Sequence, residues 1–376
     1  APVTVAVHLR SLTSKVLDTA QRLGLAEVLG QRLSQLPADL LARIHLASLA
    51  LAPAAGLVLV DSVSTAATGD DRKAIASALR RRAKAGAVVL WADHDLDSVW
   101  EHADRLVELD DGLVHHDGSP EDWFPHRLPE PTLLALARTL GFPPERCRDA
   151  AGAAEFFHRQ VCRPAPLPTG REPRRGDAVP VASEALGLQG EDLTLGGREC
   201  VGLVDRAGRA EPLARALARQ LRGAALVTGH LPVEATPRRI SRAWERRHAL
   251  PDGSVLETAP SLRPDQPLVS HGSGDLAKLR AALAAGPECP LWMPHPQAGL
   301  DADLRSGPPG PRLVTSRDVE FLVRACHRIL VVEAGKVVAF GTPNAVAAVL
   351  PDPPLVSQAV GSPRHVRLTE VLEAAP

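Results

Sequence analysis

The stretch Gly197–Gln220, GRECVGLVDRAGRAEPLARALARQ, decides how the rest of the chain is interpreted. It opens with a short apolar run, Cys200–Val204, which is typical of a strand. A turn follows at Asp205–Pro212, and Leu213–Gln220 then places leucine and alanine on one face of a helix and arginine on the other. This order of strand, turn and helix is the layout of a phosphate-binding P-loop.

The turn itself lacks the chemistry of a working P-loop, GxxxxGK[ST], in which glycines let the backbone wrap the phosphates, lysine reaches the outer phosphates and a hydroxyl holds Mg²⁺. The two glycine positions are Asp205 and Ala210, the lysine position is Glu211 and the hydroxyl position is Pro212. A carboxylate in place of an ammonium group changes attraction into repulsion, a swing of roughly 8 kcal/mol for unit charges ~4 Å apart at an effective dielectric constant of ~20, before screening. We therefore expect Asp205, Gly208, Glu211 and Pro212 to form a degenerate loop that does not hold ATP.

Composition indicates a globular protein with room for two domains. The chain has 376 residues, 45% hydrophobic and 23% charged, with a net charge of −1, so no global field recruits nucleic acid. The cluster Arg80–Arg82 fits a solvated helix face better than a nucleic-acid contact, because no aromatic residues interleave with it. The sequence carries no signal peptide, and its first residue, Ala1, favours a fragment of a longer protein.

Cysteine and histidine spacing gives little support for a metal site. The five cysteines contain no CxxC pair, so buried or incidental thiols in a reducing compartment are favoured over disulfides or metal ligands. The adjacent pair His115 and His116 fits a surface strand better than a metal centre. The longest apolar run, Leu46–Val60, is interrupted by Pro53 and Gly56, which indicates a helix end and a buried strand rather than a membrane span.

Helical and strand-like patterns alternate through the first part of the chain, which predicts an α/β sheet with mostly parallel strands. Three-to-four spacing of apolar residues predicts four helices, at Ser14–Leu29, Pro37–Ile44, Ala66–Arg82 and Ser98–Ala103. Continuous apolar runs predict two buried strands, at Leu57–Asp61 and Ala87–Ala92. A strand–turn–strand follows at Arg105–His116. Further along, a proline-rich region holds two short helical patches, at Thr132–Leu140 and Asp149–His158.

The chain repeats itself. Asp95–Pro120, DLDSVWEHADRLVELDDGLVHHDGSP, aligns without a gap to Asp318–Pro343, DVEFLVRACHRILVVEAGKVVAFGTP. The match continues, with a one-residue slip, from LPEPTLL at Leu128–Leu134 to LPDPPLV at Leu350–Val356. We interpret this as two copies of one domain in tandem.

With these features the sequence resembles the ATPase subunits of ABC transporters, most closely the energy-coupling-factor branch for cobalt and vitamin uptake. Domains of that branch often carry a tail similar to LPEPTLLALARTLG at Leu128–Gly141, and tandem fusions occur in it. The resemblance implies that each half has a P-loop, a signature LSGGQ, a strand ending in DEP and a switch histidine.

In the first half the resemblance implies a signature at LSQLP, which keeps Ser34. The strand end keeps Asp61 as the metal aspartate but has Ser62 in the place of the glutamate, and the switch keeps His94. Taken alone, Asp61 fits a surface carboxylate and His94 a hydrogen-bonded structural residue, so both alternatives stay open.

In the second half the implied signature is VSHGS, which keeps Ser270 and Gly272. The metal aspartate has become Pro294 and the glutamate His295, and Arg317 replaces the switch histidine. His295 acting as a base in place of the glutamate is a weaker alternative, because no aspartate lies beside it.

We therefore expect an α/β, P-loop NTPase-like fold in two tandem copies, with a first half at 1–128, a linker at 129–180, a second half at 181–350 and a tail at 351–376. The resemblance implies ATP and Mg²⁺ as cofactors and a transmembrane transporter component as partner, at the inner face of the cell membrane. It also implies a pseudo-dimer in which Asp61 and His94 face Ser270 and Gly272 across a site between the halves. Since the first half lacks a P-loop, little or no ATP hydrolysis is expected. A non-catalytic interaction protein with the same fold is the alternative.

Overall fold

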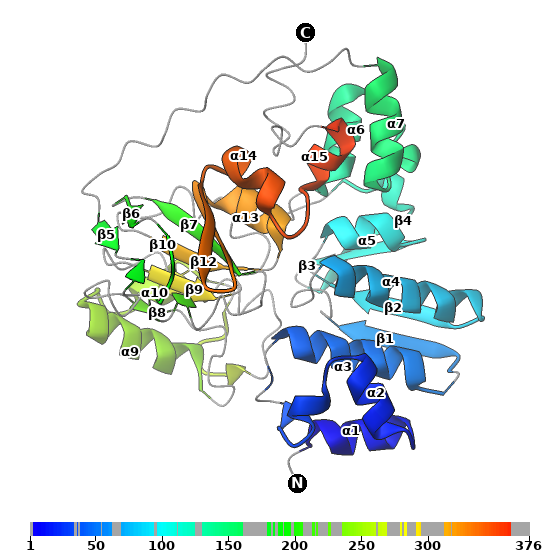
Figure 1. Cartoon of the computed structure of the whole chain (residues 1–376), viewed down its shortest axis with the longest axis horizontal. Helices are drawn as coiled ribbons and strands as arrows, with labels where there is room; N and C mark the ends of the chain where they lie inside the picture. The colour runs from blue at the N-terminus through cyan, green and yellow to red at the C-terminus, as the bar shows by residue number, and fades with distance from the viewer. Residues whose placement is uncertain are drawn as a thin grey trace. The chain divides into compact units, whose positions relative to one another are not determined.

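The computed structural model describes residues 3–33, 36, 38–53, 55–61, 69–93, 96–110, 112–124, 130–160, 179–181, 183–184, 187–190, 192–196, 199–205, 213–214, 216, 225–226, 235–260, 262–268, 279, 282–283, 291–294, 312–316 and 318–361. Contacts divide the chain into two compact units, Ala1–Ala153 (unit 1) and Ala154–Pro376 (unit 2). Figure 1 shows both, with unit 1 in blue to green and unit 2 in green to red. The boundaries at 128 and 180 stay predictions.

Unit 1 begins with a small helical cluster. Its described elements are α1 (Val5–Leu12), α2 (Val16–Arg22), a 3-10 turn (Ala26–Val28) and α3 (Ala38–Leu51). Thr4 caps α1 by accepting a hydrogen bond from the Val7 N–H. The buried side chains Val5, Leu9 and Ile44 form the centre of this cluster.

Two parallel strands and a long helix follow, as the apolar patterns predict. These are β1 (Leu57–Asp61), α4 (Gly69–Lys84) and β2 (Val88–Ala92), with Leu57 opposite Val88 and Asp61 opposite Ala92. One face of the pair packs on α3 and α4 through Val60, Ile75 and Leu79. The prediction that both strands are buried was wrong for the other face, where Leu57, Leu59, Val88 and Leu90 are each more than half exposed.

The rest of unit 1 is a hairpin and a helical tail. Its described elements are α5 (Leu96–His102), β3 (Leu106–Asp110), β4 (Leu113–Gly118), a 3-10 turn (Pro120–Asp122), α6 (Thr132–Leu140), a second 3-10 turn (Pro144–Arg146) and the start of α7 (Ala150–Gln160). The helix predicted at Thr132–Leu140 is confirmed with the same bounds. It ends at Gly141, whose φ of 69° lies in the left-handed region that suits glycine.

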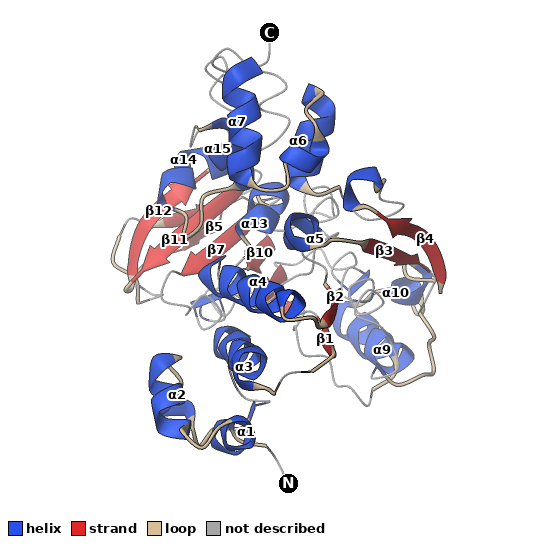
Figure 2. Ribbon diagram, turned by 90° about the vertical axis from the view of Figure 1, so that its right-hand side faces the viewer, coloured by secondary structure: helices blue, strands red, loops and turns tan. Residues whose placement is uncertain are grey.

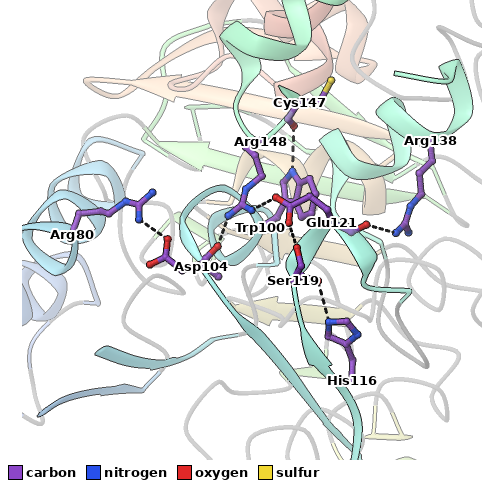
Figure 3. Close-up of polar contacts among 10 residues, drawn as sticks. Arg80, Trp100, Asp104, His116, Ser119, Glu121, Arg138, Cys147 and Arg148 are labelled. Atoms are coloured by element: carbon purple, nitrogen blue, oxygen red, sulfur yellow. Dashed lines mark hydrogen bonds and ion pairs between the residues drawn. The ribbon is translucent and has the colours of Figure 1, made fainter. Parts of the chain in front are cut away.

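Ion pairs and hydrogen bonds hold the tail on α5 and the hairpin (Figure 3). The Arg148 guanidinium pairs with Glu121, donates to the Ala103 carbonyl and lies 5.1 Å from the Trp100 ring centroid. The Trp100 indole N–H in turn donates to the Cys147 carbonyl at 3.2 Å. Because Trp100 and Cys147 are fully buried, residues 130–153 are an integral part of unit 1.

Unit 2 contains a six-stranded sheet in the order β12-β11-β7-β10-β9-β8. Figure 2 labels four of its strands, β12, β11, β7 and β10. Its strands are β7 (Cys200–Asp205), β8 (Ala225–Leu226), β9 (Leu291–Pro294), β10 (Arg312–Thr315), β11 (Arg328–Glu333) and β12 (Lys336–Gly341). All pairings are parallel except that of β11 with β12. A separate antiparallel pair joins β5 (Val179–Val181) to β6 (Leu193–Leu195).

The two faces of this sheet pack against different elements. The helical elements described here are α9 (Pro237–His248), α10 (Ser254–Glu257), α13 (Val319–Ala325), α14 (Pro343–Val346), a 3-10 turn (Ala347–Val349) and α15 (Leu355–Val360). One face of the sheet packs on α13 through Val204, Val314 and Phe321. The other face packs on the β5–β6 pair and on Ala214.

The repeat seen in the sequence is present as matching structure. Helix α5 in unit 1 and α13 in unit 2 begin and end at aligned residues. The hairpins β3–β4 and β11–β12 share their register, because Leu106 pairs with Gly118 as Ile329 pairs with Gly341. Both hairpins also carry an irregularity after the same aligned residue, Glu108 in one and Val331 in the other. The tandem interpretation therefore holds for this part of the fold.

A buried ion pair lies at the start of β7 and β11 in unit 2. The Arg328 guanidinium and the Glu199 carboxylate are almost fully buried, with one N···O distance of 2.5 Å. The same guanidinium donates to the Thr194 carbonyl and lies 4.2 Å from the Phe340 ring centroid. The Glu199 carbonyl accepts a hydrogen bond of 2.7 Å from the Arg312 N–H. This cluster therefore ties together the beginnings of β7, β10 and β11.

We predict that Glu199→Ala destabilises unit 2 by about 3–5 kcal/mol, because it leaves the Arg328 guanidinium buried without its counter-charge. Urea denaturation of the 376-residue chain, followed by tryptophan fluorescence, measures this. The control is Asp117→Ala, which removes the partner of Arg105, the residue aligned with Arg328. The Arg105–Asp117 pair is exposed, so its loss should not shift the midpoint. Equal effects of the two variants would contradict the structural role of Glu199.

Candidate functional site

The topology of unit 2 marks one end of β7 as the place where a ligand would bind. After β7 the chain runs to the β8 edge and returns through β9 and β10; it then crosses β7 to reach β11 on the other side. In open α/β sheets, ligands bind beyond the carboxyl ends of the strands at such a switch point. Asp205 ends β7, so the first P-loop position lies at this point.

The register brings the predicted motif positions to the same edge of the sheet. Thr315, the last residue of β10, is level with Leu203 of β7 on one side and with Pro294, the end of β9, on the other. The described strand ends that carry or precede the predicted P-loop, metal and switch positions therefore lie side by side, and the roles of those positions stay predictions. Six predicted site residues lie outside the described residues: His94, Gly208, Glu211, Pro212, Ser270 and Gly272.

Among the described residues at this edge, two differ from those of a nucleotide triphosphate site. Asp205 is level with Val332, so its carboxylate follows the same edge as Glu333 at the end of β11. Two carboxylates repel phosphates, whereas a phosphate site needs backbone N–H groups and a cation. Pro294 provides no oxygen ligand from its side chain at the metal position. The described residues Asp205 and Pro294 therefore do not match the glycine and the metal-binding aspartate of an ATP site, and no chemical step follows from them. Because Gly208, Glu211 and Pro212 lie outside the described residues, the loss of ATP binding stays a prediction.

A buried hydroxyl group lies between these strand ends. Thr315 is fully buried, and its Oγ1 makes no hydrogen bond to any group that the structure describes. An unpaired buried hydroxyl costs roughly 1–3 kcal/mol in mutational data. Its position between β7 and β9 makes it part of the switch-point edge rather than of the apolar core.

In unit 1, Asp61 at the end of β1 is level with Ala92 at the end of β2. Asp61 is exposed and lies opposite Ala92, one residue before Asp93, whose carboxylate accepts a 2.8 Å hydrogen bond from the Trp91 indole N–H. Because His94 lies outside the described residues, the roles of Asp61 and His94 stay predictions. Among the residues that the structure describes, no group of three or more histidine, cysteine, aspartate or glutamate side chains could hold a metal ion.

Cysteines behave as the spacing predicts in the described part of the chain. Cys147, Cys200 and Cys326 are buried free thiols. Burial, with smaller contributions from Glu145 and Asp149, raises the pKa of Cys147 to about 11. This thiol is therefore protonated at neutral pH and is a poor nucleophile.

Sequence reasoning missed the Glu199–Arg328 pair, which fixes the position of β7. The two residues are 129 positions apart, and no local pattern links them. The one available signal was the repeat, which aligns Arg328 with Arg105 but provides no counterpart of Glu199. Likewise, the Arg148–Glu121 pair that holds the tail of unit 1 had no sequence signature.

Solved structures similar to this chain share low sequence identity with it. An RNase-L Inhibitor matches with a TM-score of 0.51 and 15% identity, over 93% of this chain and 74% of its own. ABCE1 in a model of ribosome-bound archaeal Pelota and ABCE1 gives a TM-score of 0.58 and 15% identity, over 93% and 64%. UvrA2 from Deinococcus radiodurans gives 0.53 and 14%, over 88% and 55%.

Neither a protein-family model nor a curated protein matches the sequence. Identity of about 15% carries information on the fold alone, and the matched structures are ABC ATPase-family proteins. Together with the switch-point topology, they show that this chain has the α/β fold of ABC-type P-loop ATPases.

Proposed function

We propose that this protein is a degenerate subunit, or pseudo-subunit, of an energy-coupling-factor uptake transporter, with little or no ATP hydrolysis of its own. The ABC-type fold supports the general class, and the tail LPEPTLLALARTLG at Leu128–Gly141 supports this branch of it. In this role the chain would lie at the inner face of the cell membrane, against a transmembrane component.

The proposed loss of catalysis rests on two residues at the switch point of the sheet. Asp205 and Pro294 occupy the ends of β7 and β9, where a phosphate cradle and a metal ligand would be needed. Because a fold can persist after its site is lost, unit 2 would act as a scaffold. The proposed pseudo-dimer between the halves remains part of this hypothesis.

Helix α9 gives unit 2 a surface suited to a partner. Ile240 and Trp244 pack on the core, whereas the opposite face exposes four arginines: Arg239, Arg242, Arg246 and Arg247. Arg238 is held by Asp265 at 2.7 and 2.8 Å, and this hydrogen bonding lowers the pKa of Asp265. Such a fixed basic face would steer an acidic segment of a partner protein toward α9.

A non-catalytic interaction protein with the same fold is the second candidate. The similar structures include a ribosome-bound ABCE1 and the archaeal ribosome recycling factor aABCE1 in complex with a ribosomal stalk protein. In the described part of the chain, no helix is both long enough and apolar enough to cross a bilayer.

Restoring the P-loop consensus should create ATP binding. We predict that calorimetry with Mg-ATP gives no binding heat for the unaltered chain. The fourfold variant Asp205→Gly, Ala210→Gly, Glu211→Lys, Pro212→Ser should gain measurable affinity, because it removes two carboxylates and adds the lysine and hydroxyl. Glu257→Lys combined with Asp252→Asn, two exposed substitutions, gives the same change of +3 in net charge and serves as the control. Micromolar binding by the unaltered chain would refute the proposed loss.

Membrane association should require both a partner and α9. Co-expression with its neighbouring genes should bring the chain into the membrane fraction, and Arg239→Glu with Arg246→Glu should reduce that fraction several-fold. The matched control reverses two exposed charges on α4, Arg81→Glu and Lys84→Glu, and should leave the distribution unchanged. A chain that stays in the supernatant when all neighbours are co-expressed would favour the interaction protein instead.

A further inference from the structure

One apolar face of the strands in unit 1 is exposed in the part of the chain that the structure describes, and we call it the uncovered face. Three of its side chains expose half or more of their surface: Leu90 (57%), Val107 (50%) and Leu109 (67%). The gapless match between the halves, carried back through the switch position, gives their counterparts in unit 2. Those counterparts are almost fully buried: Leu313 (2%), Leu330 (1%) and Val332 (2%).

In unit 2 a layer of polypeptide covers this face. It consists of the β5–β6 pair, the central strand β7 and the helical residues that follow the P-loop position. Its buried members in contact with the three counterparts form one cluster: Val181, Leu193, Leu195, Val201, Leu203 and Ala214. All of them fall within residues 179–216.

The other face is alike in the two units. Trp100 and Leu106 of unit 1 are buried, as are their counterparts Val323 and Ile329. The difference is therefore confined to the face that the 179–216 layer covers in unit 2. General loosening of unit 1 would have exposed both faces.

The hydrogen-bond partners of the strands also indicate that unit 1 lacks a covering segment that unit 2 has. In unit 2, β10 and β11 both hydrogen-bond to β7, which lies between them. In unit 1 the corresponding strands β2 and β3 belong to separate two-stranded sheets, and each pairs only with its other neighbour among the described strands. Each therefore keeps an open edge that could accept a further strand.

The ion pair made by the aligned arginine, Arg328 in unit 2 and Arg105 in unit 1, also differs between the units. Arg328 is buried because Glu199, a residue of the layer, neutralises it. The aligned Arg105 has a side chain that is 69% exposed and pairs instead with Asp117 of its own hairpin. A carboxylate in the position of Glu199 would give Arg105 the environment that Arg328 has.

We propose that the uncovered face of unit 1 receives a segment of the same polypeptide that precedes α1 and has the topology of residues 179–216. Its central strand lies between β2 and β3 and runs parallel to both. Chain order supports this source, because the halves are collinear and the covering layer of unit 2 precedes β9 and β10. The strand ends beside Ala92 of β2, at the same end of the sheet as Asp61 of β1, and the loop that follows it lies at that end. This inference is independent of the transporter proposal.

The test compares the 376-residue chain with the product of the complete reading frame, each carrying one of two lysine substitutions. Leu109→Lys places a charge on the uncovered face. It should lower the Tm of the longer protein by about 5 °C or more and leave that of the 376-residue chain unchanged. Leu113→Lys is the matched control, because Leu113 is 64% exposed and its counterpart in unit 2 is the exposed Lys336. It should be neutral in both forms.

Three outcomes would overturn the proposal. A reading frame that encodes no such segment before α1 removes the occupant. A longer protein that tolerates Leu109→Lys shows that the face stays uncovered. A 376-residue chain that sediments as a dimer, and dissociates on Leu109→Lys, shows that a second copy covers the face instead.

Discussion

The sheet of unit 2 depends on β7 being hydrogen-bonded along both edges. Parallel pairing with β10 on one side and β11 on the other makes it the strand that connects the two directions of the chain. The buried Glu199–Arg328 pair fixes its beginning, and the apolar residues Val201 and Leu203 fill one face. An ion pair this deeply buried stabilises only while both partners remain, so the centre of the fold tolerates little change there.

Within β7, the residues that support the fold differ from the residue at the nucleotide-binding position. Its apolar body organises the sheet, whereas its end, Asp205, lies where phosphate would have to bind. Packing and catalysis therefore depend on different residues of one element, and the second can be lost while the first persists. Unit 1 differs, because Asp61 lies at a strand end but the described strands β2 and β3 do not share a central strand.

Features encoded locally or repeated in the chain could be predicted from the sequence. Helix Thr132–Leu140 was predicted as a helical patch and strand Leu57–Asp61 from its continuous apolar run, and the repeat predicted the matching hairpins. The irregularity that the hairpins share was not predicted. Burial was harder to predict, because an apolar run such as Leu57–Asp61 looks the same whether one face or both are covered. The pairing of Arg328 with Glu199 could not be predicted, because contacts between residues far apart in the sequence leave no local pattern.

Hydrogen exchange of the 376-residue chain, with and without millimolar Mg-ATP, tests the central claim most directly. If β7 is the organising strand of a sheet that has lost its nucleotide site, amides of β7 and β11 should exchange far more slowly than those of β2 and β3. Addition of Mg-ATP should change none of these rates. Protection of residues 205–216 on adding Mg-ATP, or fast exchange in β7, would contradict the account.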